Sequence, residues 1–597
     1  MSAPAAPALC ADAFLGVERS LTGRRWQAAP GDARLALTLA QRLGLPEVVG
    51  RALAARGIGL DDAELFLSPQ LKHLLPDPSH LRDMDKAAKR LADAVMAGEP
   101  IGIFGDYDVD GATSSALLRI FLESAGATVR VHIPDRITEG YGPNAPALLR
   151  LQADGIGVVV TVDCGTTAYA PLAAAAEAGL DVIVVDHHEA EPELPRCFAL
   201  VNPNRLDEDS PHGHLAAVGV TFLVIVAVNR VLKQAGWYQT RKAPDLMQWL
   251  DIVALGTVCD VVPLKGVNRA LVTQGLKVMA KRANVGLSAL SDVAGIKERP
   301  DAYHLGYVLG PRVNAGGRVG EAELGTRLLA TEDPVEAAEI AKLLDGYNKD
   351  RQEIEAAVLQ QAMEQVEGRA DDGLPLVVAA GEDWHPGVIG IVAGRLKERY
   401  NRPACVIALD GGDGKGSGRS VPGLDLGAAI IAARQSGVLK AGGGHAMAAG
   451  FTVAREKLDE FRAFLADRLQ AQLTGDLVPI LELDGALDCA GCTTALIETL
   501  KQLGPFGAGN PEPRFAITAA RIIKADVVGN GHVRVILKGN GGASLKAIAF
   551  RAADSDMGQA LMTSRGGAFH LAGTLRADTW QGSTSVQLVI EDAASAR

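Results

Sequence analysis

The sequence lacks the features that mark membrane and secreted proteins. Its longest apolar run, Leu215 to Val228, has fourteen residues, whereas a membrane-spanning helix needs about 20, so the run predicts a buried helix. The seven cysteines are odd in number and scattered, which indicates a reducing compartment. No basic residue precedes Arg19, so the charged start of a signal peptide is missing. We expect a cytoplasmic protein without membrane contact.

Positive charge and aromatic rings are also scarce. Lys and Arg number 59 against 71 Asp and Glu, a net charge of −12, and aromatic residues make up 4%. This balance excludes a protein that coats nucleic acid through bulk positive charge, but it allows one focused phosphate-binding site. With 48% hydrophobic residues in a chain of 597, the composition is that of a globular protein of about four domains. Glycine is in excess, at 67 residues.

Short apolar runs alternate with helical segments, which predicts a parallel α/β sheet covered on both faces. The runs with strand character are Pro100–Gly105, Ala127–Ile133, Gly157–Val162 and Asp181–Val185. A helical pattern then continues from Pro334 to Gly368, typical of a connector between domains. Beyond it we expect a second α/β region with glycine-rich loops, Gly411 to Gly418 and Gly442 to Gly444, and then a small all-β barrel or sandwich.

These changes of pattern predict five segments along the chain. The expected boundaries are residues 1–75 for an N-terminal helical segment, 76–328 for the parallel-sheet domain, 329–370 for the connector helix, 371–473 for the second α/β domain and 474–597 for the barrel.

The strongest local signal is a row of three alternating carboxylates, Asp106, Asp108 and Asp110, between an apolar run and a helical segment. The row begins like the calcium loop of an EF-hand, but the twelfth position, which must be Glu, is Leu117. It also resembles the nucleophile motif of haloacid dehalogenases, in which Thr follows the Gly, whereas Ala112 stands at that position here. Taken alone, the row is also compatible with a polar turn that has no function.

Further acidic residues and histidines follow other apolar runs of the same domain. Asp163 ends one run, His187 and His188 follow the next, and Asp260 comes after Ile252–Val258, which is expected to be a further strand. Because the carboxyl ends of parallel strands share one edge of a sheet, these residues and the acidic row should meet there. Packed carboxylates repel one another unless cations neutralise them. Oxygen ligands with one or two imidazoles favour Mn²⁺ or Mg²⁺, and the set is large enough for two ions with Asp163 as a bridge.

The sequence resembles a known family at several motifs. Asp108 to Gly111, Asp163, Asp186 to His188, and Gly256 to Asp260 resemble the four motifs of the DHH phosphoesterase superfamily. Three later stretches, Pro311 to Arg318, Gly416 to Ser420 and Gly443 to Gly450, resemble the RecJ branch, the bacterial single-strand-specific 5′→3′ exonucleases. The resemblance extends from about Leu60 to the C-terminal barrel, and the motifs occur in the family order.

The resemblance implies a fold and a set of metal ligands. The fold is a parallel-sheet DHH domain, joined by a long helix to a second α/β domain (the DHH-associated domain) and followed by an OB-like barrel. One cation would be held by Asp110, Asp163, His187 and Asp260, and the other by Asp108 and Asp163 with Asp106 nearby. Catalytic roles fall to His188, beside the reacting phosphate, and to Asp106. Many superfamily members have a His where this chain has Phe104, so Asp106 or a water would fill that place.

The resemblance also implies residues that bind the substrate. The expected ligands of the 5′-phosphate are Arg136, Ser417, Arg419, Gly443, Gly444 and His445. Arg312, Asn314 and Arg318, expected in a polar loop, would contact the DNA backbone, with surface ion pairs as the alternative for the arginines. Residues 514–597 hold ten Lys and Arg against six Asp and Glu. This positive barrel has few aromatics, which favours contact with the DNA backbone over base stacking.

Together these features predict an exonuclease with two Mn²⁺ or Mg²⁺ ions that hydrolyses single-stranded DNA from the 5′ end to 5′-mononucleotides. An alternative is a DHH-family hydrolase of short oligoribonucleotides, cyclic dinucleotides or pyrophosphate, although such relatives are usually compact and lack the barrel. A non-catalytic single-strand-binding protein is a third possibility. A role in recombination and repair, with single-strand-binding protein and a RecQ-type helicase as partners, is implied by the resemblance alone.

Overall fold

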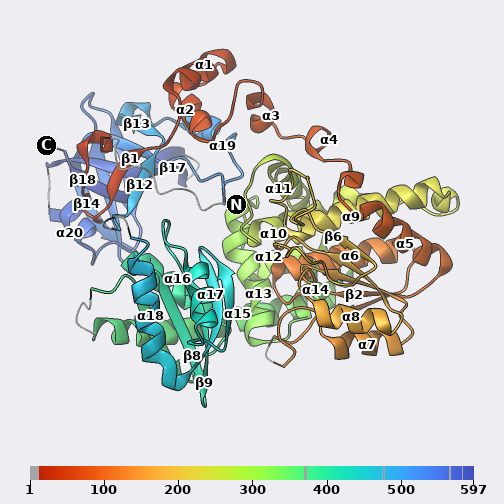
Figure 1. Ribbon diagram of the computed structural model, residues 1–597. Helices are drawn as coiled ribbons and strands as arrows, with labels where there is room; N and C mark the ends of the chain where they lie inside the picture. Colours follow the sequence, from red (N-terminus) through yellow and green to blue (C-terminus); the bar gives the residue numbers. More distant parts are fainter. Residues whose placement is uncertain are drawn as a thin grey trace. The chain divides into compact units, whose positions relative to one another are not determined.

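The computed structural model describes residues 12–136, 138–368, 373–473, 475, 477–563, 566–580 and 583–596. The chain forms two compact units. Figure 1 labels their helices and strands. Unit 1 comprises Met1–Ala63, Arg351–Gln502 and Pro513–Arg597, and unit 2 comprises Glu64–Asp350 and Leu503–Glu512. Both units are therefore assembled from segments that lie far apart in the sequence.

Unit 2 is built around a sheet of five parallel strands in the order β3-β2-β4-β5-β6. Their bounds are β2 Ile101–Phe104, β3 Val129–His132, β4 Val158–Val162, β5 Asp181–Val185 and β6 Ala199–Val201. The four strands expected from the sequence in this region are confirmed. Strand β3 lies on one side of β2 and β4 on the other, so the strand order reverses between β2 and β4, which is where ligands bind in open α/β sheets.

Helices cover both faces of this sheet, which explains why its strands are apolar without alternation. One core contains Val158 and Val160 of β4 together with residues of α5 (Met84–Ala97), α6 (Val109–Ser124) and α9 (Ala217–Gln234). The other contains Val159 with residues of α7 (Ala145–Ala153) and α8 (Tyr169–Glu177). Helix α9 is long and apolar enough to cross a membrane, but 67% of it is buried inside the structure. The expected buried helix is therefore confirmed.

One expected strand of unit 2 is a helix instead. Residues Leu250–Cys259 form α10, which is capped at Asp260, so the prediction of a strand over Ile252–Val258 is wrong. Nearly all residues of α10 are buried. A short, continuous apolar run has no period that separates a buried helix from a buried strand.

The remaining helices of unit 2 lead to the long connector. They are α11 (Gly266–Met279), α12 (Val285–Val293), the π-helical turn η5 (His304–Leu309), α13 (Gly310–Val319) and α14 (Leu324–Ala330). Helix α15, Pro334–Glu367, is a single helix of 34 residues that passes from unit 2 into unit 1, as expected. The expectation of a polar loop around Asn314 is wrong, because this residue lies on α13. That helix needs its glycines: a Cβ atom on Gly317 would lie 2.2 Å from the Tyr107 carbonyl oxygen.

Unit 1 contains a mixed sheet in the order β10-β11-β9-β8-β7, in which only β7 and β8 are parallel. Its strands are β7 Val377–Glu382, β8 Ala404–Asp410, β9 Asp413–Arg419, β10 Ala441–His445 and β11 Ala448–Ala454, and its helices are α16 Ile389–Tyr400, α17 Leu426–Gln435 and α18 Leu458–Gln470. The two glycine runs expected as loops lie mainly in β9 and β10. Glycine is needed there because a Cβ atom on Gly416 would lie 2.1 Å from the Phe451 ring.

The C-terminal part of unit 1 is the expected OB-like barrel. Pairing of β14 with β17 closes the strands β14-β15-β16-β18-β17, and β13 adds to β14. The bounds are β13 Gly485–Leu487, β14 Phe515–Val528, β15 His532–Lys538, β16 Ser544–Ala549, β17 Ala568–Trp580 and β18 Ser583–Ser595, with α19 Thr494–Lys501 and α20 Asp556–Thr563. Three of these strands, β14, β17 and β18, have 13 or 14 residues.

The N-terminal segment is not entirely helical. It contains α1 Ala33–Leu43, α2 Glu47–Ala55, α3 Ala63–Leu67 and α4 Leu71–Leu74, but Arg25–Ala28 form β1, which pairs in parallel with β12, Ile480–Leu483. Trp26 of β1 is fully buried and donates through its Nε1 to Asp592 at 2.8 Å. A strand of four residues paired with a partner so distant in sequence has no local signal.

Replacing either of two glycines of unit 2 by alanine should have opposite effects on stability. A Cβ atom on Gly275 of α11 would lie 2.1 Å from the Leu250 carbonyl oxygen of α10, whereas a Cβ atom on Gly346 of α15 meets nothing within 4 Å. Gly275→Ala should cost about 1–3 kcal/mol by overpacking, and Gly346→Ala should stabilise by about 0.5–1 kcal/mol because alanine is the better helix former. Thermal unfolding followed by circular dichroism should give midpoints that shift in opposite directions; equal midpoints would contradict the packing of α10 on α11.

Candidate metal centre

Seven side chains from four segments meet at the carboxyl edge of the sheet in unit 2. Asp106, Asp108 and Asp110 follow β2, Asp163 follows β4, His187 and His188 follow β5, and Asp260 caps α10. We call these seven residues the acidic cluster. Their ligand atoms lie within 4.8 Å of one another in three groups: Asp163, His187 and His188; Asp110, His187 and Asp260; and Asp106, Asp108 and Asp163. Two residues, Asp163 and His187, each belong to two groups.

Helix termini orient the carboxylates that follow β2. Asp108 is the N-cap of α6, and its Oδ1 accepts a hydrogen bond from the Gly111 backbone N–H at 3.0 Å. Asp110 lies in the first turn of α6, and its two oxygens accept from the backbone N–H groups of Ala217 (2.6 Å) and Val218 (2.9 Å), at the start of α9. Unpaired N–H groups at a helix N-terminus favour an anion. The Asp110 carboxylate is therefore fixed by two helices.

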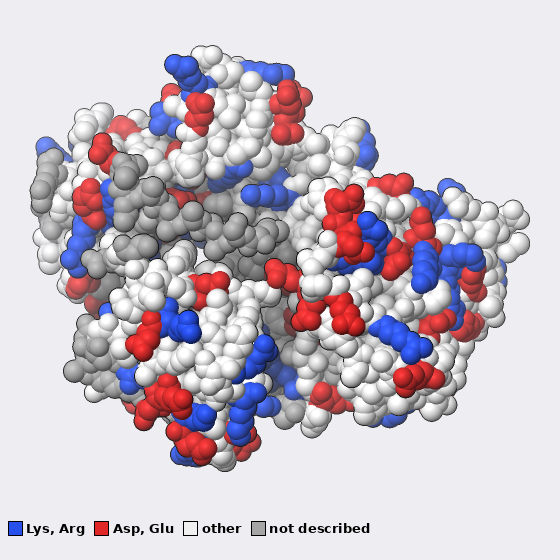
Figure 2. All heavy atoms as spheres, in the orientation of Figure 1, with Lys and Arg blue, Asp and Glu red and all other residues white. Residues whose placement is uncertain are grey.

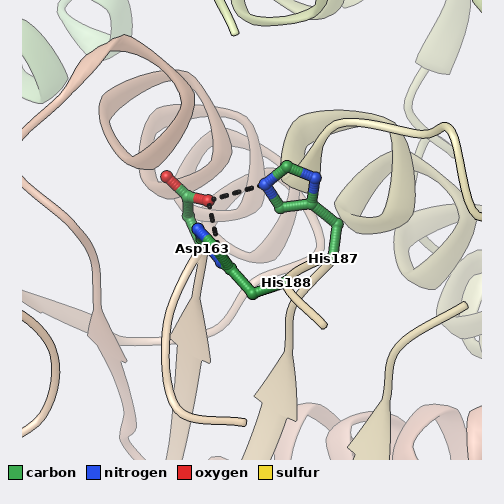
Figure 3. Close-up of side chains that lie close together, drawn as sticks. All are labelled: Asp163, His187 and His188. Carbon is green, nitrogen blue, oxygen red and sulfur yellow. Dashed lines mark ion pairs between the residues drawn. The ribbon is translucent and has the colours of Figure 1, made fainter. Parts of the chain in front are cut away.

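His187 presents one ring nitrogen to three carboxylates. Its Nδ1 lies 3.1 Å from the Leu215 carbonyl oxygen, so Nδ1 carries the proton that is donated there. Its Nε2 lies 3.4 Å from Asp163, 3.7 Å from Asp260 and 3.9 Å from Asp110. Figure 3 shows His187 and His188 directed at the same Asp163 carboxylate. A tautomer fixed by a carbonyl on one side leaves the other nitrogen free to bind a metal.

Asp186, which lies just before the two histidines, orients both of them. It is 1% exposed and accepts hydrogen bonds from the backbone N–H groups of Thr166, His187 and His188. The Nδ1 of His188 lies 2.7 Å from the same carboxylate. These hydrogen bonds make Asp186 a positioning residue for both histidines.

Burial and mutual repulsion disfavour ionised carboxylates in the cluster. Burial, together with the charges of neighbouring carboxylates, raises the pKa of Asp110 to about 7 and that of Asp260 to about 9. The same two causes hold the pKa of Asp106 and of Asp163 well above the usual range. The carboxylates of this cluster therefore need a positive charge among them.

The pKa values of the two histidines are shifted in opposite directions. Burial, with the charge of His188, lowers the pKa of His187 to about 4, which keeps its ring neutral as a metal ligand must be. Burial also lowers the pKa of His188, but its hydrogen bond to Asp186 and the charge of that carboxylate outweigh burial and raise the pKa to about 9. At neutral pH His187 is therefore uncharged, whereas His188 carries a positive charge.

The cluster fits divalent cations that prefer oxygen ligands. Asp106 Oδ1 and Asp260 Oδ2 are buried and have no hydrogen-bond partner in the part of the chain that the structure describes, which is costly unless a cation satisfies them. Two residues of the site also have a left-handed backbone, since the φ angles of Asp163 and Val261 are 61° and 60°. Carboxylates with imidazole and no thiolate suit Mn²⁺ or Mg²⁺ better than structural zinc. Phe104 is fully buried, and Asp106 joins the group with Asp108 and Asp163.

Two asparagines that were not predicted hold the histidine loop, and an unpredicted tyrosine holds the backbone of Asp163. Asn202 donates through Nδ2 to the His188 carbonyl oxygen at 2.8 Å, and Asn204 donates to that of His187 at 2.5 Å. Both follow β6, the next strand of the sheet, so the strand-end rule that located Asp163 could have found them. The Tyr141 hydroxyl donates to the Asp163 carbonyl oxygen at 3.2 Å, and its position in a long loop gave no such signal.

The three arginines of unit 2 that the resemblance assigns to substrate binding differ in their surroundings. The Arg136 guanidinium lies 5.1 Å from the centre of the Tyr107 ring, and Arg318 acts electrostatically on the same tyrosine. Arg312 instead forms an ion pair with Asp345 at 2.9 Å and donates to the Val308 carbonyl oxygen, which ties α13 to α15. Figure 2 shows positive and negative side chains interspersed over the face in view. Binding of a polyanion therefore depends on particular arginines.

The other predicted phosphate ligands lie in unit 1, Ser417 and Arg419 on β9 and Gly443, Gly444 and His445 on β10. Arg419 is half-buried, which lowers its pKa, and it donates to Ser417 Oγ (3.1 Å) and the Gly418 carbonyl oxygen (2.8 Å). Among the described residues it pairs with no carboxylate. A Cβ atom on Gly390, near the start of α16, would lie 3.1 Å from both Arg419 and Ser417. A cation, a hydroxyl and a helix N-terminus thus converge as in phosphate sites.

Family comparisons match three parts of the chain. Residues 100–257 match the model of the DHH family N-terminal domain, residues 373–471 that of the DHHA1 domain, and residues 483–592 that of the RecJ OB domain. Similar proteins include single-stranded-DNA-specific exonucleases RecJ of Dickeya dadantii, 37% identical, and of Escherichia coli, 36% identical. Each alignment covers 92% of this chain and 96% of the relative.

Solved structures agree with this similarity. The crystal structure of RecJ from Thermus thermophilus in complex with Mn²⁺ matches with a TM-score of 0.80 and 29% identity, over 96% of this chain and 79% of that one. The complex of that protein with Mg²⁺ matches with a TM-score of 0.74 and 28% identity, over 96% and 78% of the two chains.

Divalent cations should stabilise unit 2 through Asp163. Adding Mn²⁺ to protein treated with EDTA should raise the thermal midpoint by several degrees, because binding to the folded state alone stabilises it. Asp163→Asn keeps the shape and tolerates the positive φ, yet it should lose most of this shift. Asp251→Asn is the control: Asp251 is 1% exposed, with a pKa that burial raises to about 7, but it lies outside the cluster. Equal Mn²⁺ shifts in both variants would contradict the assignment.

Proposed function

The chain belongs to the RecJ family of single-stranded-DNA-specific exonucleases, and we propose that it degrades a single strand from the 5′ end and releases 5′-mononucleotides. It is a metal-dependent nuclease with Mn²⁺ or Mg²⁺ as cofactor. Repair and recombination of DNA are the processes to which this family membership points. The alternative of a compact hydrolase of short oligoribonucleotides, cyclic dinucleotides or pyrophosphate does not agree with the closed OB barrel.

The observation that carries the proposal is the convergence of buried, unsatisfied carboxylate oxygens with one neutral histidine at the reversal of strand order. Asp110, Asp163, His187 and Asp260 would hold one cation, and Asp106, Asp108 and Asp163 the other. When bound, the cations supply polarisation of the phosphodiester and a water of lowered pKa as nucleophile.

The chain's own residues orient the reacting groups. Asp186 holds the His188 ring through Nδ1, which leaves Nε2 to meet the reacting phosphate. There it would stabilise developing negative charge or give a proton to the leaving 3′-oxygen. The N–H groups of Ala217 and Val218 hold Asp110 in place, so that ligand needs little rearrangement when the substrate arrives.

Degradation from the 5′ end requires that the enzyme recognise that end of the strand. Arg419 and Ser417, with the N-terminus of α16, would bind the terminal 5′-phosphate, since the guanidinium has no carboxylate partner among the described residues. His445 and the glycines of β10 would contribute from the far side of β11, since Ala448 of β11 pairs with both Arg419 and His445. Arg136 and Arg318, in unit 2, would contact the phosphates near the cluster.

The barrel would contact the backbone of the strand more than its bases. Phe515 and Phe569 are buried in its core, whereas Phe550 is 52% exposed. We further propose a cytoplasmic location and association with single-strand-binding protein and a RecQ-type helicase.

The polarity is tested with single strands labelled at either end, incubated with Mn²⁺. A 5′ label should appear at once as a mononucleotide, while a 3′ label should stay on progressively shorter strands until the last step. Asp163→Asn should release neither label at a measurable rate while still binding the strand. Early release of a 3′-terminal mononucleotide would contradict the proposed direction.

The proposed role of Arg419 in binding the 5′-phosphate is tested by comparing strands that carry a 5′-phosphate with strands that carry a 5′-hydroxyl. Wild type should prefer the phosphate, and Arg419→Ala should lower kcat/KM on the phosphorylated strand roughly 10- to 100-fold, as loss of a charge-assisted hydrogen bond predicts. It should change activity on the hydroxyl strand much less. Arg455→Ala removes an exposed arginine of the same unit that pairs with Glu382, and it should behave as wild type. A preference for phosphate that persists in Arg419→Ala would contradict the role.

A further inference from the structure

Two tyrosines of unit 2 stack on each other at the surface. Tyr303 and Tyr307 lie four residues apart, at the start of η5 and within it, with ring centres 5.2 Å apart and planes at 26°. They are 59% and 75% exposed, while Leu305 and Leu309 of the same turn are fully buried. Stacking of two rings contributes only about 0.5–1.5 kcal/mol, which does not explain why both remain in water. Adjacent exposed aromatic rings are a common feature of surfaces that bind single-stranded nucleic acid.

The helix that follows these tyrosines runs beside the acidic cluster. Helix α13 continues directly from η5; η5 packs on α10, which ends at Asp260, and α13 packs on α6, which carries Asp110. At one end Cys259, which precedes Asp260, donates through Sγ to the Leu305 carbonyl oxygen at 3.4 Å. At the other end Gly317 packs on Tyr107, the residue between Asp106 and Asp108. A strand that leaves the cluster along this helix meets the tyrosines.

The charges next to the tyrosines suit a polyanion. Lys297 and Arg299, in the loop before η5, are exposed and form no ion pair among the described residues. The two carboxylates of the same loop, Glu298 and Asp301, lie 3.2 Å and 2.7 Å from the two ring nitrogens of His304. The two cations are therefore available to a ligand, while each acid has a histidine nitrogen within hydrogen-bond distance. Aromatic rings among unpaired cations are the common feature of single-strand binding surfaces.

We propose that Tyr303 and Tyr307 form a stacking platform for nucleobases of the DNA strand, with Lys297 and Arg299 on its phosphates. The platform rests on the proposed function, since it holds the part of the strand that is still to be degraded. Stacking accepts every base, because each has a π-face, so the platform aligns the strand without sequence preference. Tyr303 and Tyr307 are positioning residues, because they act on the bases and not on the reacting phosphate.

The test compares wild type with the double variant Tyr303→Ala/Tyr307→Ala on two 5′-phosphorylated strands of equal length. One strand is unmodified, and the other carries abasic residues from the third nucleotide onward. On the unmodified strand, kcat/KM of the double variant should fall roughly tenfold or more. On the abasic strand, wild type should fall to the level of the double variant. The control Tyr169→Ala removes a tyrosine of α8 that donates to the Glu193 carbonyl oxygen, and it should match wild type.

A second measurement avoids turnover. In EDTA, a strand with 2-aminopurine near its 5′ end should lose fluorescence on binding wild type, and it should lose much less on binding the double variant. An unchanged kcat/KM in the double variant, or an equal loss on both strands, would overturn the platform. Failure of wild type to hydrolyse the unmodified strand with Mn²⁺ would instead overturn the proposed function, and the fluorescence would still decide whether the bases stack.

Discussion

Repulsion between carboxylates at the reversal of strand order is the constraint on which the rest of unit 2 depends. Two unit charges 4 Å apart interact by about 4 kcal/mol at an effective dielectric constant of about 20, and Asp106, Asp110, Asp163 and Asp260 are all buried or nearly so. Such a group persists only where cations neutralise it and where the surrounding structure leaves it no room to separate. The raised pKa of Asp163 and the unsatisfied oxygens of Asp106 and Asp260 are consequences of this constraint.

The fold supplies that confinement through elements far apart in the sequence. The N-terminus of α9 holds Asp110, the end of α10 supplies Asp260, and the turn η5 with α13 packs against Cys259 and Tyr107 on either side. These contacts require close approach of backbones. A Cβ atom on Gly256 of α10 would lie 2.3 Å from Thr113 Oγ1, and one on Gly111 would lie 2.4 Å from the Asp106 carbonyl oxygen. The glycine excess therefore serves packing around the cluster as well as the strands of unit 1.

Much of this architecture could be predicted from the sequence, because parallel strands buried on both faces leave continuous apolar runs and place their following residues at one edge. That rule located Asp108, Asp110, Asp163, His187 and His188. It also placed Asp260 correctly at this edge, although Asp260 follows a helix and not the predicted strand. A run of apolar residues does not distinguish a strand from a buried helix. Contacts between residues distant in sequence could not be predicted, because they form only on folding. Examples are the ion pair between Arg312 and Asp345 and the hydrogen bond from the Ala217 N–H to Asp110. The glycine runs were assigned to loops because glycine usually marks turns, whereas here it lets strands pack closely.

The net charge of −12 is compatible with a DNA substrate. Part of it is the acidic cluster itself, and the positive groups that we propose as DNA contacts are few and particular, such as the half-buried Arg419. The most direct test of the central claim is the number of Mn²⁺ ions that the metal-free chain binds, measured by isothermal titration with the coupling between ions followed by electron paramagnetic resonance. We expect two ions per chain, magnetically coupled because both would be held by Asp163, with the coupling lost in Asp163→Asn. Binding of uncoupled ions that is indifferent to this substitution would contradict it.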